Sequence, residues 1–251
     1  MNINVFFIQL KSNLWDERYK FMILLIIFVF QVLSSIISIF YMEELLTLFG
    51  FDFISPVPPT GEAAFLDFFG DQFLFGIIII TLGTMNIFAS DIENGSISYS
   101  LSRPISRSQF ASAKMMARIS ALITPFIIAS FLGWIYMGIV FEVIPFEKVL
   151  WAVLPLGLFF IYLGVTTSAL STRVSALIAG LIAIGIFIIQ FTISAFEPLE
   201  LLSPFTFVNI WIDLLSNSKV NRDIIINIGL LIGWILLPTR LAIYSFKTRD
   251  L

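Results

Sequence analysis

Six stretches of this sequence are long and apolar enough to cross a lipid bilayer as helices. A helical residue rises about 1.5 Å and the hydrocarbon layer is about 30 Å thick, so one crossing needs about 20 apolar residues. Backbone polar groups find no water in that layer, which favours helices. The stretches are Phe21–Phe40, Gln72–Ser90, Ile119–Phe141, Val149–Leu170, Val174–Ala195 and Ile224–Tyr244. We expect an all-α polytopic membrane protein, with residues 1–251 forming one transmembrane domain.

The composition supports this class and excludes several kinds of chemistry. The chain is 59% hydrophobic and 12% charged, with a mean hydropathy of +1.00, whereas soluble domains are about 25% charged. It has no cysteine and no histidine. Disulfides are therefore excluded, and the commonest metal ligand and general base are missing. We expect no metal site and no catalytic residues. We also expect no cleavable signal peptide, because the first residues lack a basic start followed by a short apolar core.

The basic residues predict the orientation. An even number of spans puts both termini on one side, and lysine and arginine gather on the cytoplasmic side. The first loop, Tyr41–Asp71, has no basic residue and six acidic ones. With both termini inside, most basic residues fall inside: Lys11, Arg18, Lys20, Arg103, Arg107, Lys114, Arg118, Arg173, Arg240, Lys247 and Arg249. We therefore expect both termini to be cytoplasmic.

Three segments outside the spans have patterns of their own. Asn2–Lys20 carries apolar residues at helical spacing, which predicts an amphipathic helix in the inner interface or an ordinary juxtamembrane anchor. Glu62–Phe73 is also amphipathic, and we expect it to lie on the outer surface before the second span. Phe196–Asp223 is apolar but is broken by Pro198 and Pro204. It predicts a pair of short, re-entrant-like outer helices between the fifth and sixth spans.

The polar segment Ser90–Phe110 separates the second and third spans. Ser90 and Glu93 have the spacing of a helix capping box, and so do Ser106 and Gln109. Pro104 lies between them and ends the first helix. The pattern predicts helix, kink and helix on the cytoplasmic side, suited to docking on a soluble partner. The alternative is a plain loop whose basic residues only set the orientation.

The sequence DIENGSISYSLSRPISRSQFASAK (residues 91–114) resembles the segment that follows the second span in ABC-2 type transporter permeases. The family pattern is an acidic residue, E-x-G-[ST]-[LI], a short run to L-[SAT]-x-P-[VI]-S-R, an aromatic residue and a lysine. The segment LSPFTF (residues 202–207) and the whole-chain layout resemble the family as well. One departure is Ser96, where threonine is commoner. The matching residues are Glu93, Gly95, Ser96, Ile97, Leu101, Ser102, Pro104, Ile105, Ser106, Arg107, Phe110 and Lys114.

The resemblance implies a prokaryotic cytoplasmic-membrane permease that pairs with a second, identical or different, permease subunit and with two ATP-binding subunits. ATP and magnesium would bind to those partners, and no nucleic-acid partner is implied. Consistently, the sequence has no G-x-x-x-x-G-K-[ST] phosphate loop. The helix after the second span would be the coupling helix that docks on the ATPase, flanked by the N-terminal helix. The residues implied at that interface are Asp91, Glu93, Gly95, Ile97, Arg103, Pro104 and Arg107.

A few small and polar residues within the spans have two possible uses. Gln31, Asn86 and Gln190 could line a transport path or form hydrogen bonds between helices. Small residues in the fifth span permit close helix approach, either within the subunit or, as the resemblance implies, across a dimer. These are Ala176, Ala179, Gly180 and Ala183.

The function predicted from these features is that of a permease in an ATP-driven exporter. The charge-poor spans favour an amphiphilic or hydrophobic cargo. The alternative is a non-transporting assembly or immunity subunit with the same fold. An intramembrane enzyme is disfavoured because the polar catalytic groups are missing, and an ion-coupled transporter because the span centres lack acidic residues.

Overall fold

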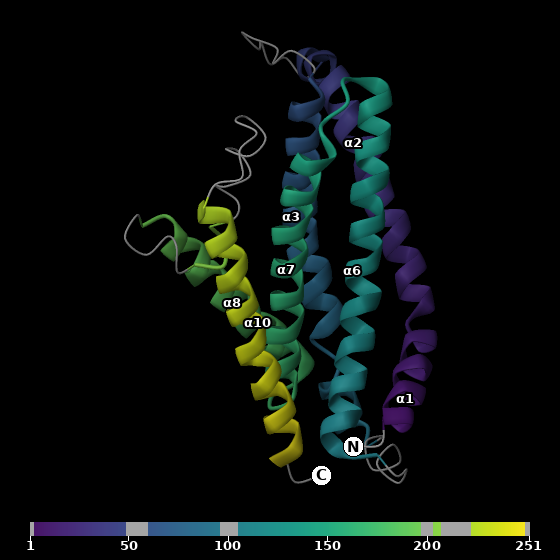
Figure 1. Ribbon diagram of the computed structural model, residues 1–251, viewed down its shortest axis with the longest axis vertical. Coiled ribbons are helices and arrows are strands. Elements are labelled where there is room, and N and C mark those ends of the chain that lie inside the picture. Colours follow the sequence, from purple (N-terminus) through teal and green to yellow (C-terminus); the bar gives the residue numbers. More distant parts are fainter. Residues whose placement is uncertain (1–2, 49–59, 96–104, 197–202, 207–221, 249–251) are drawn as a thin grey trace.

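The computed structural model describes residues 3–48, 60–95, 105–196, 203–206 and 222–248, and every regular element in these ranges is a helix. The long helices form an elongated bundle, and both chain ends lie at the same end of it (Figure 1). The elements are α1 (Ile3–Asp16), α2 (Arg18–Leu48), α3 (Gly61–Thr84), α4 (Ala89–Glu93), α6 (Arg107–Val140), α7 (Phe146–Ser171), α8 (Ala176–Ser194) and α10 (Arg222–Thr248).

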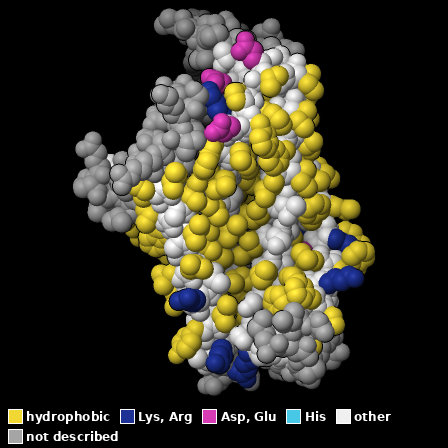
Figure 2. Space-filling model, viewed as in Figure 1, with side chains coloured by type: hydrophobic (Ala, Val, Ile, Leu, Met, Phe, Trp, Pro, Cys, Tyr) yellow, Lys and Arg dark blue, Asp and Glu magenta, His cyan; other side chains and the backbone are white. Residues whose placement is uncertain are grey.

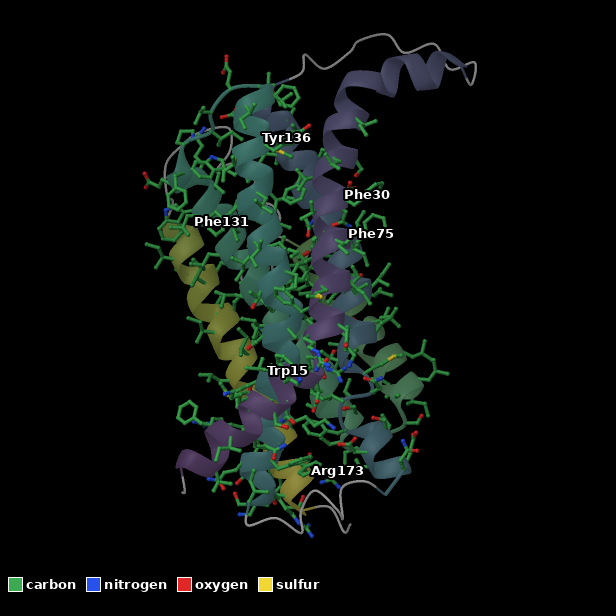
Figure 3. All side chains as sticks on the ribbon, turned by 90° about the vertical axis from the view of Figure 1, so that its right-hand side faces the viewer. Trp15, Phe30, Phe75, Phe131, Tyr136 and Arg173 are labelled. Atoms are coloured by element: carbon green, nitrogen blue, oxygen red, sulfur yellow. The ribbon has the colours of Figure 1, made fainter. Side chains whose placement is uncertain are left out.

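The six predicted spans are confirmed as six helices long and apolar enough to cross a membrane. The predicted helix within Asn2–Lys20 is also present, as α1. Figure 3 shows α1 running obliquely away from the start of α2, with Trp15 near their junction. The predicted outer helix pair falls largely in 197–202 and 207–221, outside the described residues.

The prediction for the segment before the second span is wrong. The segment Glu62–Phe73 is not a separate surface helix, because α3 begins at Gly61 and continues unbroken to Thr84. Thr60 caps this helix, and its side-chain oxygen accepts a hydrogen bond from the Ala63 backbone N–H at 3.2 Å. The apolar face of the segment is part of the protein core, and three of its phenylalanines are fully buried there: Phe65, Phe68 and Phe69.

The core is built from aromatic rings around α7, the most buried of the six long helices. Phe159 and Phe160 of α7 are fully buried, and the Phe160 ring packs edge-on against Phe126 of α6, 5.1 Å between centroids. Lipid tails are as apolar as these side chains, so close packing rather than the hydrophobic effect holds such helices together. Gly76 of α3 lies directly against the Phe160 ring, which lets these two helices approach closely.

On the face shown in Figure 2, apolar side chains cover the middle of the surface and charged side chains lie towards its two ends. Exposed apolar residues include Phe30 on α2 and Phe75 on α3, both labelled in Figure 3. At the end opposite the termini, Lys148 pairs with Glu62 at 2.8 Å. This distribution is the one expected of a protein that contacts lipid around its middle.

Candidate functional site

The basal end is the end of the bundle that carries both termini. It contains α1, the elbow at Glu17 between α1 and α2, α4, and the adjoining ends of α3, α6, α7, α8 and α10 (Figure 1). The polar segment predicted to dock a partner begins here, with α4. Residues 96–104 of that segment lie outside the described residues.

The start of the segment is a short helix with an exposed tip. After a turn at 85–88, α4 covers Ala89–Glu93, and the Asn94 backbone N–H then donates to the carbonyls of Ser90 and Ile92. Gly95 has a φ of 67°, in the left-handed region that glycine adopts without strain. Glu93, Asn94 and Gly95 are exposed. We call these three residues the tip.

The predicted capping box at Ser90 is wrong, whereas the one at Ser106 is confirmed. Ser90 lies inside α4, and its hydroxyl donates to the Asn86 carbonyl at 2.7 Å instead of capping a new helix. At the start of α6, the Ser106 hydroxyl accepts from the Gln109 backbone N–H at 3.3 Å. The Gln109 side chain accepts from the Ser106 backbone N–H at 3.3 Å.

The base of the segment is held by an ion pair and by a second apolar core. Asp91 of α4 pairs with Lys114 of α6. In the second apolar core, the Phe246 ring of α10 lies 5.0 Å from the Phe88 ring and 5.9 Å from the Phe110 ring, measured between centroids. This cluster is separate from the main core around α7 and is buried. It joins the residues before α4, the start of α6 and the end of α10 into one packed unit.

Two arginines at the ends of other elements bind the end of α10. Arg107, the first residue of α6, donates to the Lys247 carbonyl at 3.4 Å. Arg173, between α7 and α8, donates to the Thr248 hydroxyl at 3.1 Å. Figure 3 shows Arg173 at this end of the bundle. Cations are favourable at a helix C-terminus, where carbonyls lack helical partners.

A buried ion pair lies where α1, α3 and α6 meet. Glu17 and Arg118 are each 8% exposed, and Arg118 Nε donates to Glu17 Oε1 at 2.7 Å. Arg118 Nη1 donates to the Gly83 carbonyl and, at 3.2 Å, to Asn86 Oδ1. Sequence reasoning used Arg118 only for orientation. The sequence gives no signal for a partner 101 positions away, because neither residue belongs to a motif.

A model of the ABC-2 family of transporter proteins matches residues 61–251, which include all of the helices from α3 to α10. The chain belongs to this family. No curated protein matches the sequence. The family match confirms the resemblance found in residues 91–114 and makes the chain an ABC-2 transporter membrane subunit. Glu17 precedes the matched range, whereas Arg118 lies within it.

Of the interface residues implied by the resemblance, this ABC-2 subunit places some at the tip and others at its base. Glu93 and Gly95 belong to the exposed tip, and Asp91 and Arg107 make the contacts described above. Three others lie outside the described residues: Ile97, Arg103 and Pro104. In the described part of the ABC-2 subunit, no group of three or more acidic side chains could hold a metal ion.

The three candidate path-lining residues make hydrogen bonds within the subunit. Gln72 of α3 donates to the Gln31 side chain of α2 at 2.5 Å, and Gln190 of α8 bonds the Tyr162 hydroxyl of α7 at 2.7 Å. Asn86 accepts from Arg118. These bonds match the second use that the sequence left open, namely interhelical bonding.

The small residues of α8 lie between helices of the same subunit. Ala179, Gly180 and Ala183 are buried, and a Cβ at Gly180 would lie 3.0 Å from the Met85 sulfur and 3.9 Å from the Thr81 methyl group. Ala176 is half-buried. At Gly180, the close approach is therefore used against the end of α3 in this subunit.

Proposed function

We propose that this ABC-2 membrane subunit is the permease of an ATP-driven exporter and that its Asp91–Arg107 segment docks on a separate ATP-binding subunit. The observation that carries the proposal is the contrast between an exposed tip and a fixed base. Glu93, Asn94 and Gly95 are free to meet a partner, while the Asp91–Lys114 pair and the Phe246 cluster bind the base to α6 and α10. Such an element transmits movement of a partner into the bundle.

Charge supports a basic docking surface on the partner. Glu93 makes no hydrogen bond or ion pair with the described part of the chain, and it is the acidic residue of the tip. A complementary positive cleft would steer the encounter and fix the register of docking. ATP and magnesium would bind to the partner, and hydrolysis there would drive the movement.

The distribution of charge supports an orientation with both termini in the cytoplasm of a prokaryote. Lys11, Arg107 and Lys247 lie at the basal end, whereas Glu62, Glu142 and Glu147 lie at the opposite end with Lys148. Cytoplasmic segments are enriched in basic residues. Docking of a cytoplasmic ATPase at the basal end requires this same orientation, so the proposed topology and the proposed docking are consistent.

The proposed assembly contains two permease subunits, identical or different, and two ATP-binding subunits. We propose α8 as part of the face that meets the second permease, as first expected from its small residues Ala176, Ala179, Gly180 and Ala183. Because Ala179, Gly180 and Ala183 are buried within their own subunit, the side chains of α8 available for pairing are Leu177, Leu181 and Ile188, which are exposed.

An amphiphilic or hydrophobic cargo fits the interior best. Gln31 and Gln190 are already hydrogen-bonded within the subunit, so they are poor ligands for an ion or a polar solute. The remaining surfaces of the long helices are mostly apolar. Movement of such a cargo needs relative tilting of helices rather than a chain of charged groups.

The test is to co-express the subunit with candidate ATP-binding subunits of the same genome and to purify it in lipid nanodiscs. We expect a complex whose native mass corresponds to two permease and two ATP-binding chains, and ATP turnover that rises with amphiphilic compounds. A subunit that captures no ATPase would contradict docking. A stable complex whose turnover no amphiphile changes, and which moves none of them, would favour the assembly or immunity alternative.

A further inference from the structure

We infer that Arg118 is a positioning residue that clamps the α1–α2 elbow to the end of α3, so that α1 and the docking segment move as one body. The inference rests on the proposed function, because it assigns the elements through which that segment acts. It adds residues that the family match does not cover, since Glu17 and α1 precede residue 61.

The first half of the clamp binds the elbow. Glu17 lies between α1 and α2, where a turn separates the two helices. One carboxylate oxygen accepts from Arg118 Nε at 2.7 Å, and the other lies 2.9 Å from the Lys20 ammonium. A carboxylate and a guanidinium that are both buried are costly to separate, because each would be left uncompensated away from water. The elbow is therefore tied to α6 at a fixed point.

The second half of the clamp binds the end of α3. Arg118 Nη1 donates to the Gly83 carbonyl and to Asn86 Oδ1. Because α3 ends at Thr84, the Gly83 carbonyl has no helical partner and needs one from elsewhere. The planar guanidinium donates to the carboxylate and to this carbonyl from two nitrogens held rigidly in one plane, whereas a lysine ammonium is one rotatable donor group on a flexible stem and fixes neither direction.

The position of the clamp gives it a mechanical role. The end of α3 leads within a few residues into α4 and the tip. On the other side, the elbow leads into α1, which packs against α6. Beside the elbow, the Arg18 guanidinium lies over the Trp15 and Tyr19 rings, 4.5 Å from each centroid, and these aromatic residues are exposed. Tryptophan and tyrosine with apolar neighbours are typical of headgroup depth. The clamp therefore fixes the position of the docking segment relative to α1, a helix held in the membrane interface.

A merely structural ion pair would stabilise the fold without fixing the relation between α1 and the tip. A structural role and a positioning role predict different losses when the guanidinium of Arg118 is replaced by another cation. Arg118→Lys keeps a cation for Glu17 but loses simultaneous contact with Gly83. Glu17→Gln keeps a hydrogen-bond acceptor of the same shape but removes the ion pair. Neither residue contacts a docking partner directly, because both are buried.

The experiment measures the distance between α1 and the tip in the permease alone. The chain has no native cysteine, so Ser12→Cys and Asn94→Cys, both at exposed positions, give a doubly spin-labelled subunit in nanodiscs. Pulsed electron resonance should show one narrow distance distribution. We expect Arg118→Lys, Arg118→Gln and Glu17→Gln to lose the narrow distribution while the thermal melt of Arg118→Lys stays close to that of the parent. Lys148→Gln, which breaks the ion pair at the opposite end, should leave the distribution narrow.

A charge swap supplies the second readout. Glu17→Arg combined with Arg118→Glu should regain part of the narrow distribution that each single variant loses. Once an ATPase partner is in hand, the amount of cargo moved per ATP should fall in Arg118→Lys and recover in the swap. A narrow distribution in folded Arg118→Gln, or unfolding of all the single variants, would overturn the positioning role. The distance measurement needs no ATPase, so it separates failure of this inference from failure of the proposed docking.

Discussion

Gly76→Val is expected to destabilise the folded subunit by about 3 kcal/mol, because inserting atoms into a filled core forces side chains and backbone apart. A Cβ at this position would lie 2.6 Å from Cε1 of Phe160 and closer still to Cζ. Phe160 is fully buried, and its ring packs against Phe126, so it has no free space into which to turn. The added methyl groups of valine enlarge the conflict.

The matched control is Gly70→Val on the same helix. A Cβ at Gly70 has no heavy atom within 4 Å, and the residue is exposed. Both substitutions change the helix propensity of α3 alike, so the difference between them reports packing alone. Thermal or denaturant melts in one detergent measure it. Equal melts for the two variants would show that α3 and α7 do not pack through Gly76. Phe160→Leu combined with Gly76→Val should regain part of the stability that Gly76→Val loses, because the shorter side chain vacates the space of the ring.

Glu93→Arg is expected to weaken binding of the ATP-binding subunit at least about tenfold, since like charges placed at a complementary interface repel. The folded permease should be unaffected, because Glu93 is exposed and pairs with no described residue. Any loss of affinity must then arise at the contact between the tip and the ATP-binding subunit. Affinity of the purified ATPase for permease in nanodiscs measures binding, and cargo moved per ATP measures coupling.

Glu142→Arg is the control for that charge reversal. Glu142 is also exposed but lies at the opposite end, after α6. It should leave both affinity and coupling at the parent values. Full ATPase affinity and full coupling in both variants would mean that the tip is not the docking element. The proposal for Asp91–Arg107 would then be wrong.

The predicted features that the structure confirms depend on short-range or summed properties of the sequence. The six spans follow from apolar length alone, which no tertiary contact can reverse. The cap at Ser106 follows from a spacing of three residues at a true helix start. The similar spacing at Ser90 gave a wrong prediction, because a cap requires the chain to be non-helical there, and Ser90 is already inside α4.

The features that could not be predicted depend on which surfaces meet. An amphipathic pattern in Glu62–Phe73 shows that one face is apolar, but not whether that face meets lipid or the protein core. Small residues in α8 show close approach without naming the helix approached. The bond between Glu17 and Arg118 joins residues far apart in the sequence, and neither has a neighbour that marks it.

The most direct test of the central claim, that the tip docks on an ATP-binding subunit, is site-specific cross-linking. The cysteine-free chain allows one cysteine at a time, at Asn94 or at Glu142. With a short heterobifunctional reagent in membranes that contain the ATPase, we predict that Asn94→Cys forms a covalent adduct with that subunit. Glu142→Cys should form none. A permease that co-purifies with its ATPase but gives no adduct from Asn94→Cys, or gives one from Glu142→Cys, would contradict the account.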